Sequence, residues 1–226
     1  MRINRYVAAS TDLSRRAADA AVEDGRVTIN GRTATPGDQV EPEMTVALDG
    51  QTIAPRAART YLALNKPTGY VSSRARQGSD PTVYELLPEQ YHHLRTAGRL
   101  DRDSSGLMLF SDDGEFIHRH THPSQNHAKT YEVILSRAFA PTSRERLEHG
   151  VMLEDGPSRV RVHEYHGRHV TVSLSEGRNR QLRRTFGALG YGIEQLHRVA
   201  IGDYELGNLK SGHWNEVAGD RGAAPA

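Results

Sequence analysis

The sequence predicts an α+β protein in which a small α/β module precedes a larger domain with a mixed, largely antiparallel sheet flanked by helices. A length of 226 residues suits a small module joined to a medium-sized domain. Strand-like alternation recurs along the chain with few helical patterns between. We expect the module at residues 1–50, a proline-containing linker at 51–60, the larger domain at 61–217 and a mobile tail at 218–226.

The first module reads as two short helices followed by a small sheet. Ser14 stands where it can cap the second helix, and Gly25 follows the last apolar position of that helix. Apolar and polar residues then alternate up to Asn30-Gly31, a pair typical of tight hairpins. A further short strand closes the module before Asp49-Gly50.

The larger domain shows mainly strand patterns. Its apolar residues predict strands at 62–64, 107–110, 129–135, 160–162 and 170–174, and helices at 82–87, near 115, at 141–149 and at 182–189.

Composition excludes several chemistries. Because cysteine is absent, the chain has no disulfide, thiolate nucleophile, iron–sulfur cluster or cysteine-bound zinc. No apolar run is long enough to cross a bilayer, and no export signal follows Arg2 and Arg5, so we expect a cytoplasmic protein without membrane contact. A glycine fingerprint for nucleotide binding is also missing.

Positive charge is concentrated in one stretch although the whole chain carries a net charge of only +1. Residues 161–200 contain seven arginines and three glutamates. Arg178, Arg180 and Arg183 fall in a glycine-containing turn at the start of a predicted helix. This cluster is either a phosphate-binding patch or a solvated helix face.

The segment with the most candidate chemistry is the loop at residues 98–107. It carries Asp101 and Asp103, two positions apart, ahead of an apolar strand. Loops at the rim of a sheet often hold catalytic groups. The two carboxylates are compatible with a glycosidase pair, and equally with a solvated polar turn.

Five motifs in order resemble the bacterial ribosomal RNA pseudouridine synthases of the RsuA type. The matching segments are Leu64-Asn65-Lys66-Pro67, Gly98-Arg99-Leu100-Asp101, Lys129-Thr130-Tyr131, Glu176-Gly177-Arg178-Asn179-Arg180-Gln181-Leu182-Arg183-Arg184 and Leu196-His197-Arg198. The first module resembles the RNA-binding domain of ribosomal small-subunit protein four. Together the resemblances cover nearly the whole chain.

The resemblance implies isomerisation of a uridine in ribosomal RNA, without metal or cofactor. It assigns Asp101 as the essential carboxylate, which either adds to the anomeric carbon or removes a neighbouring ribose proton. We expect the Arg183 guanidinium to hold Asp101 ionised, and the Tyr131 ring to support an extruded base. Arg99 is expected to fill the space that the extruded base leaves or to bind phosphate. Lys66 and Lys129 are expected to support the pocket or contact phosphate rather than act as nucleophiles.

The expected partner is therefore ribosomal RNA, bound by a monomer. The arginines expected to contact RNA are Arg2, Arg5, Arg15, Arg16, Arg178, Arg180 and Arg184. The segment from Gly202 to Trp214 looks more like large-subunit than small-subunit enzymes. A non-catalytic assembly factor that kept the fold and a glycosidase remain the alternatives.

Alternating histidines follow the predicted helix start near residue 115. On a strand, His118, His120 and His122 would face one side and could bind zinc. We prefer histidines that face a loop or RNA, and we predict no metal site.

Overall fold

The computed structural model describes residues 1–11, 13–55, 59–122, 125 and 127–219. Its backbone divides into two compact units, residues Met1–Arg59 with Asp112–Gly114, and Thr60–Ser111 with Glu115 onward. Most of the tail expected at 218–226 lies outside the described residues. Within the described part, no helix is long and apolar enough to cross a membrane.

The first unit packs two helices against a four-stranded antiparallel sheet. Its elements are α1 (Ile3–Ser10), α2 (Arg15–Glu23), β1 (Val27–Ile29), β2 (Arg32–Thr33), β3 (Val46–Leu48) and β4 (Gln51–Ile53), with strand order β2-β1-β3-β4. The Ser14 hydroxyl accepts a hydrogen bond from the backbone N–H of Ala17 and so caps α2. Asn30 and Gly31 both have positive φ, which gives the β1–β2 hairpin its tight turn.

One difference from the sequence prediction lies at the end of this unit. Residues 51–53 were expected to begin the linker, but they form β4 and pair with β3. Asp49 and Gly50 take positive φ values of 50° and 79°, which turns the chain back on itself. The connecting segment therefore begins only after Ile53.

The second unit is built on one nine-stranded sheet, and the predicted mixed, largely antiparallel arrangement is confirmed. Its elements are β5 (Tyr61–Lys66), η1 (Val83–Leu86), η2 (Glu89–Tyr91), β6 (Arg95–Ala97), β7 (Ser105–Ser111), α3 (Gly114–Thr121), β8 (Lys129–Leu135), α4 (Pro141–His149), β9 (Val151–Leu153), β10 (Gly156–Ser158), β11 (Arg161–His166), β12 (His169–Leu174), α5 (Gln181–Ala188), β13 (Ile193–Ile201), β14 (Tyr204–Glu205) and β15 (Trp214–Glu216). The sheet runs β11-β12-β8-β13-β7-β5-β15, with β14 beside β13 and β6 beside β7. Among its described strand pairs, only β13 and β7 are parallel.

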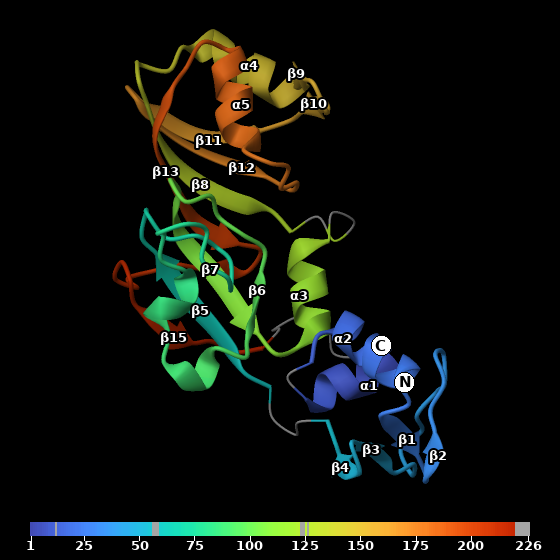
Figure 1. Ribbon diagram of the computed structural model, residues 1–226. Helices are drawn as coiled ribbons and strands as arrows, with labels where there is room; N and C mark the ends of the chain where they lie inside the picture. The colour runs from blue at the N-terminus through green and yellow to red at the C-terminus, as the bar shows by residue number, and fades with distance from the viewer. Residues whose placement is uncertain (12, 56–58, 123–124, 126, 220–226) are drawn as a thin grey trace. The chain divides into compact units, whose positions relative to one another are not determined.

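Helices cover one end of this sheet. In Figure 1, α4 and α5 lie together over the β11–β12 end, beside the separate β9–β10 hairpin. Alternate residues of β8, namely Tyr131, Val133 and Leu135, are buried in the core on this side. The expected helix at 82–87 is shorter, a 3-10 turn that Thr82 and Glu85 close with a capping box.

The topology brings one loop to the middle of the sheet. Residues 98–104 connect β6 to β7, which are antiparallel neighbours. At the start of β7, Ser105 and Gly106 pair in parallel with His197 and Arg198 of β13. The loop that carries Asp101 therefore lies where β7 meets the central strands β8 and β13.

Candidate active site

A cavity of about 870 Å³ opens beside this loop within the second unit. Its walls come from the loop after β6, the segment after β5, the turn between β12 and α5, the end of α3, and strands β8 and β13. The lining residues with ionisable or aromatic side chains are Arg99, Asp101, Arg102, His120, Lys129, Tyr131, Glu176, Arg178, Arg180 and Arg198. Asp101 and Tyr131, which the sequence placed in one site, thus share one cavity.

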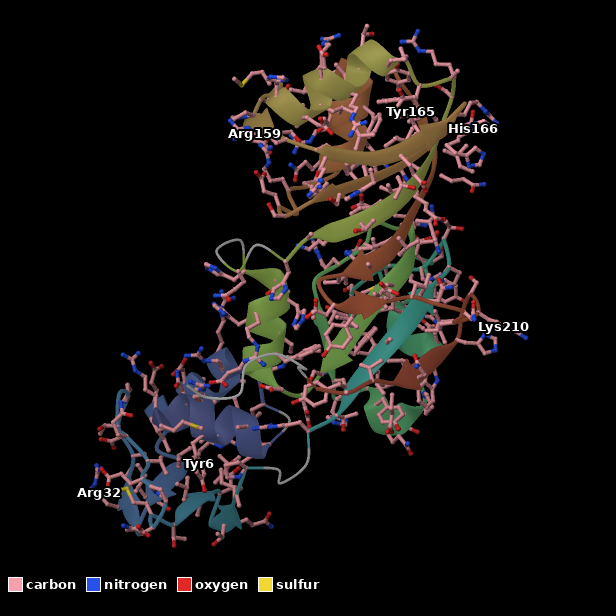
Figure 2. The ribbon with its side chains drawn as sticks, turned by 180° about the vertical axis from the view of Figure 1, so that it is seen from behind. Tyr6, Arg32, Arg159, Tyr165, His166 and Lys210 are labelled. Atoms are coloured by element: carbon pink, nitrogen blue, oxygen red, sulfur yellow. The ribbon has the colours of Figure 1, made fainter. Side chains whose placement is uncertain are left out.

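The Lys66 side chain holds the loop that carries Asp101 through hydrogen bonds to its backbone. Lys66 is fully buried, and Nζ donates to the backbone oxygens of Pro67, Asp101 and Ser104 at 3.0, 3.1 and 2.6 Å. Burial lowers the pKa of Lys66 to about 8, although the negative charges of Asp103 and Asp101 act in the opposite direction. Lys66 is therefore an internal support of the loop, in contrast to Lys210, which projects from the surface in Figure 2.

Gly106 allows the strand after this loop to approach β13 closely. Its φ is +109°, and a Cβ added there would overlap the backbone of Arg198. The Arg198 side chain is also buried, with Nε donating to the Leu107 oxygen at 2.8 Å. Only glycine combines this backbone conformation with this spacing.

The Asp101 carboxylate is partly exposed, and its cationic neighbour is not the one that the sequence suggested. Its side chain is 34% exposed, and Oδ2 lies 3.8 Å from Nη1 of Arg180. Arg183 was expected to hold Asp101, but it instead donates to the Asp103 backbone oxygen at 3.0 Å. The expectation of an Arg183–Asp101 ion pair is therefore wrong in this structure, and Arg183 is not among the described residues that line the cavity.

The Asp103 carboxylate interacts with both Arg180 and Arg183. Arg180 donates two hydrogen bonds to its carboxylate, at 3.1 and 3.0 Å, and Nε of Arg183 lies 3.3 Å from Oδ2. Burial alone would raise the pKa of Asp103, but the Arg180 hydrogen bond and the charges of Arg183 and Arg180 outweigh it, so the pKa lies below its usual value. The two loop carboxylates thus differ: Asp103 is tightly paired, whereas Asp101 has a cation only nearby.

Tyr131 and Arg198 are cross-strand neighbours on β8 and β13. Tyr131 is 8% exposed, and the guanidinium carbon of Arg198 lies 6.0 Å from the centre of its ring. Within the described residues, Nη2 of Arg198 is buried without a hydrogen-bond partner. Arg198 was not expected to have a role in the site, although a single arginine in the apolar alternation of residues 193–201 was a usable signal.

Two further expected residues lie at the same cavity. Lys129 is half-buried, and burial together with the positive charge of Arg198 lowers the pKa of its amine. Arg99 has an exposed side chain, while its backbone oxygen lies 3.4 Å from Nη1 of Arg198. Both residues line the cavity and so lie where they can meet a ligand.

The remaining arginines of the basic turn, Arg178 and Arg184, form hydrogen bonds with other groups of the protein. Arg178 donates to the backbone oxygens of Asp155 and Pro157 at 2.9 and 2.8 Å, and to the Asp155 carboxylate at 2.8 Å. Arg184 takes the second carboxylate oxygen of Asp155 at 2.8 Å. These two guanidinium groups therefore brace the β9–β10 hairpin against the turn.

The other arginines expected to meet RNA, namely Arg2, Arg5, Arg15 and Arg16, are exposed in the first unit. The histidines expected near residue 115 lie on or after α3, where His118 stacks on His122 and His120 on His127, both at 4.7 Å. In the part of the chain that the structure covers, no group of three or more metal-ligating side chains is found.

Comparison with known proteins identifies the class. The profile of the RNA pseudouridylate synthase family matches residues 60–188, and that of the S4 domain matches residues 1–46. The chain therefore belongs to the RNA pseudouridylate synthase family and carries an N-terminal S4 domain.

Individual relatives extend over nearly the whole chain. An uncharacterized RNA pseudouridine synthase of Aquifex aeolicus (strain VF5) is 32% identical over 96% of this chain and 90% of its own length. The ribosomal large subunit pseudouridine synthase B of Yersinia pestis is 34% identical over 96% of this chain and 72% of its own. A crystal structure of a pseudouridylate synthase superimposes with a TM-score of 0.70 at 31% identity, covering 96% of both chains.

Proposed function

We propose that this protein converts one uridine of large-subunit ribosomal RNA into pseudouridine, with Asp101 as the catalytic residue. The observation that carries the proposal is that Asp101, Tyr131 and Arg180 line one cavity. A carboxylate that can reach a sugar, an aromatic ring for a base and a cation near the carboxylate are the groups that this isomerisation needs.

The target nucleotide must leave its stack to reach the cavity, because a base inside a stem is inaccessible. The bond between ribose C1′ and uracil N1 then breaks, the uracil turns, and its C5 bonds to C1′. The proton on C5 is lost and N1 gains one, so substrate and product are isomers. Asp101 either adds to C1′ or removes a neighbouring ribose proton, and both routes need it ionised.

Two cationic side chains lie near Asp101. Arg180 lies 3.8 Å from its carboxylate, and the Lys66 ammonium lies beneath the same loop. Their positive charge can stabilise the carboxylate anion that either route needs.

Tyr131 and Arg198 suit the extruded base. Stacking of a base on an aromatic ring contributes about 1–3 kcal/mol. Nη2 of Arg198 is buried and unpartnered within the described residues, and a uracil carbonyl is an acceptor of the right kind. Recognition of the base would thus combine stacking with a charged donor.

The S4 domain would grip structured RNA by its shape and phosphates. Its exposed arginines Arg2, Arg5, Arg15 and Arg16 are the candidate phosphate contacts. The name of the Yersinia pestis relative supports large-subunit RNA as the substrate, with small-subunit RNA as the alternative. We further propose that the protein acts as a monomer in the cytoplasm.

The test is a map of pseudouridine in ribosomal RNA from a strain that lacks this gene. One large-subunit pseudouridine should disappear, return with the wild-type gene, and stay absent with the Asp101→Asn gene. A complete set of pseudouridines in the deletion strain would favour a non-catalytic assembly factor. Loss of a small-subunit pseudouridine would overturn the choice of RNA and keep the activity.

A further inference from the structure

One guanidinium in this site faces two carboxylates at unequal distances. Arg180 makes two parallel hydrogen bonds to Asp103, whereas its Nη1 stays 3.8 Å from Oδ2 of Asp101. A paired contact of this kind fixes the plane of the guanidinium as well as its position. Asp103 therefore determines where the cation beside Asp101 lies.

The backbone of Arg180 is also unusual. It is the N-cap of α5, with φ 46° and ψ 33° in the left-handed region. Among the described residues, the other non-glycine residues with positive φ are Asn30 and Asp49, both of types that tolerate this conformation in turns. A strained arginine beside the candidate catalytic residue points to a constraint that serves the site.

Arg183 secures the same loop from the next turn of α5. Its Nη2 donates to the Asp103 backbone oxygen at 3.0 Å and lies 3.3 Å from the Ser104 hydroxyl. Because Lys66 holds the Ser104 oxygen from the other side, the loop backbone has little freedom. The position of the Asp103 carboxylate relative to Asp101 is thus fixed by the loop itself.

We propose that Asp103 is a positioning residue that holds the Arg180 guanidinium close to Asp101 without letting it pair fully with Asp101. A cation near Asp101 stabilises its negative charge electrostatically. A carboxylate in a paired contact with arginine has its lone pairs occupied and reacts poorly. The observed spacing keeps the cation close to Asp101 without such a paired contact. This inference rests on the proposed function, because it assigns how Asp101 is kept ready to react.

The test is a double-mutant cycle with Asp103→Asn and Arg180→Met, measured as kcat and KM for pseudouridine formation in substrate RNA. In Asp103→Asn, Arg180 is released to pair with Asp101, so kcat should fall by on the order of tenfold or more, with KM nearly unchanged. Adding Asp103→Asn to Arg180→Met should cause little further loss, since Asp103 acts through Arg180. Asp103→Glu, which keeps a carboxylate, should recover part of the rate.

Control measurements separate positioning from general damage. Asp203→Asn removes an exposed carboxylate outside the cavity lining and should leave kcat unchanged. Thermal unfolding identifies any variant that fails to fold. A crystal structure of Asp103→Asn should show Arg180 within hydrogen-bond distance of Asp101, and this readout does not depend on turnover.

Two results would overturn the proposal. One is a wild-type kcat in Asp103→Asn with Arg180 unmoved in its structure. The other is an Asp103→Asn effect that persists in full on the Arg180→Met background. Failure of the proposed function would give a different result, because wild-type protein would then form no pseudouridine on RNA from the deletion strain. The position of Arg180 in the Asp103→Asn crystal structure would still test the proposal.

Discussion

Two exposed arginines of the first unit differ in their surroundings from the arginines of the basic turn in the second unit. In the first unit, Arg15 and Arg16 are exposed on α2. In the second, Arg178 and Arg184 are bound to the Asp155 hairpin, and Arg180 is bound to the Asp103 loop. A dense arginine cluster in a sequence is thus as compatible with bracing a pocket as with binding phosphate. Substitutions in the second unit should change turnover or stability, and those in the first should change RNA affinity.

The largest effect is expected from Asp101→Asn. The substitution keeps the shape of the side chain and removes its charge, so turnover should fall by about 10³-fold. RNA affinity, measured by filter binding, should stay within about twofold, since this residue contributes no phosphate contact. Retention of a tenth of wild-type turnover would be incompatible with a catalytic role for Asp101.

A structural test of the second unit is Gly106→Ala. The added Cβ would overlap the Arg198 backbone at a φ of +109°, so the free energy of unfolding should fall by more than about 3 kcal/mol. Gly114→Ala is the matched control, because Gly114 opens α3 with no heavy atom within 4 Å of an added Cβ. Denaturant titration should show the control within about 1 kcal/mol of wild type. Equal stability of the two variants would argue against the close strand approach.

The pH dependence of turnover tests the buried support of the loop. Burial lowers the pKa of Lys66 to about 8, so the ammonium predominates below that pH and is lost above it. The neutral amine has fewer protons to donate to the loop oxygens, and turnover should decline as pH rises through 8. Lys66→Arg stays charged and should shift this alkaline limb upward, even at a lower maximum rate. If wild type and Lys66→Arg lost turnover over the same alkaline pH range, the loss would not be due to deprotonation of Lys66.

The smallest effect is expected in the first unit. The Arg15→Ala, Arg16→Ala double variant should weaken RNA binding and reduce the slope of log affinity against log salt by up to about 0.9 per arginine. Its kcat at saturating RNA should match wild type. Arg159→Ala, which removes an exposed arginine of the second unit visible in Figure 2, is the control and should keep the wild-type slope. A lowered kcat in the double variant would contradict the assignment of RNA binding to the first unit and of turnover to the second.

Much of the fold could be predicted from local patterns. Alternation predicted the strand at 129–135, and the helix predicted at 141–149 is present as α4. The strand at 51–53 could not be recognised because Gln51-Thr52-Ile53 contains a single apolar residue and so shows no alternation, and its pairing with β3 defines it.

The cationic neighbour of Asp101 could not be predicted from the sequence, for a different reason. The side on which an arginine of α5 emerges depends on the backbone of the turn before the helix. There Arg180 adopts a left-handed backbone conformation that the residue types of the turn do not predict. Asp103, read from the sequence as half of a carboxylate pair or a solvated residue, accepts hydrogen bonds from that arginine instead. The contact between Asp103 and Arg180 therefore became visible only in three dimensions.

The most direct measurement is a crystal structure of Asp101→Asn bound to its substrate RNA. We expect the target nucleotide outside its stem, its ribose C1′ about 3–3.5 Å from the side chain at position 101, and its uracil beside Tyr131. A target uridine that remains stacked in its helix, or whose sugar occupies a site away from residue 101, would contradict the catalytic role of Asp101.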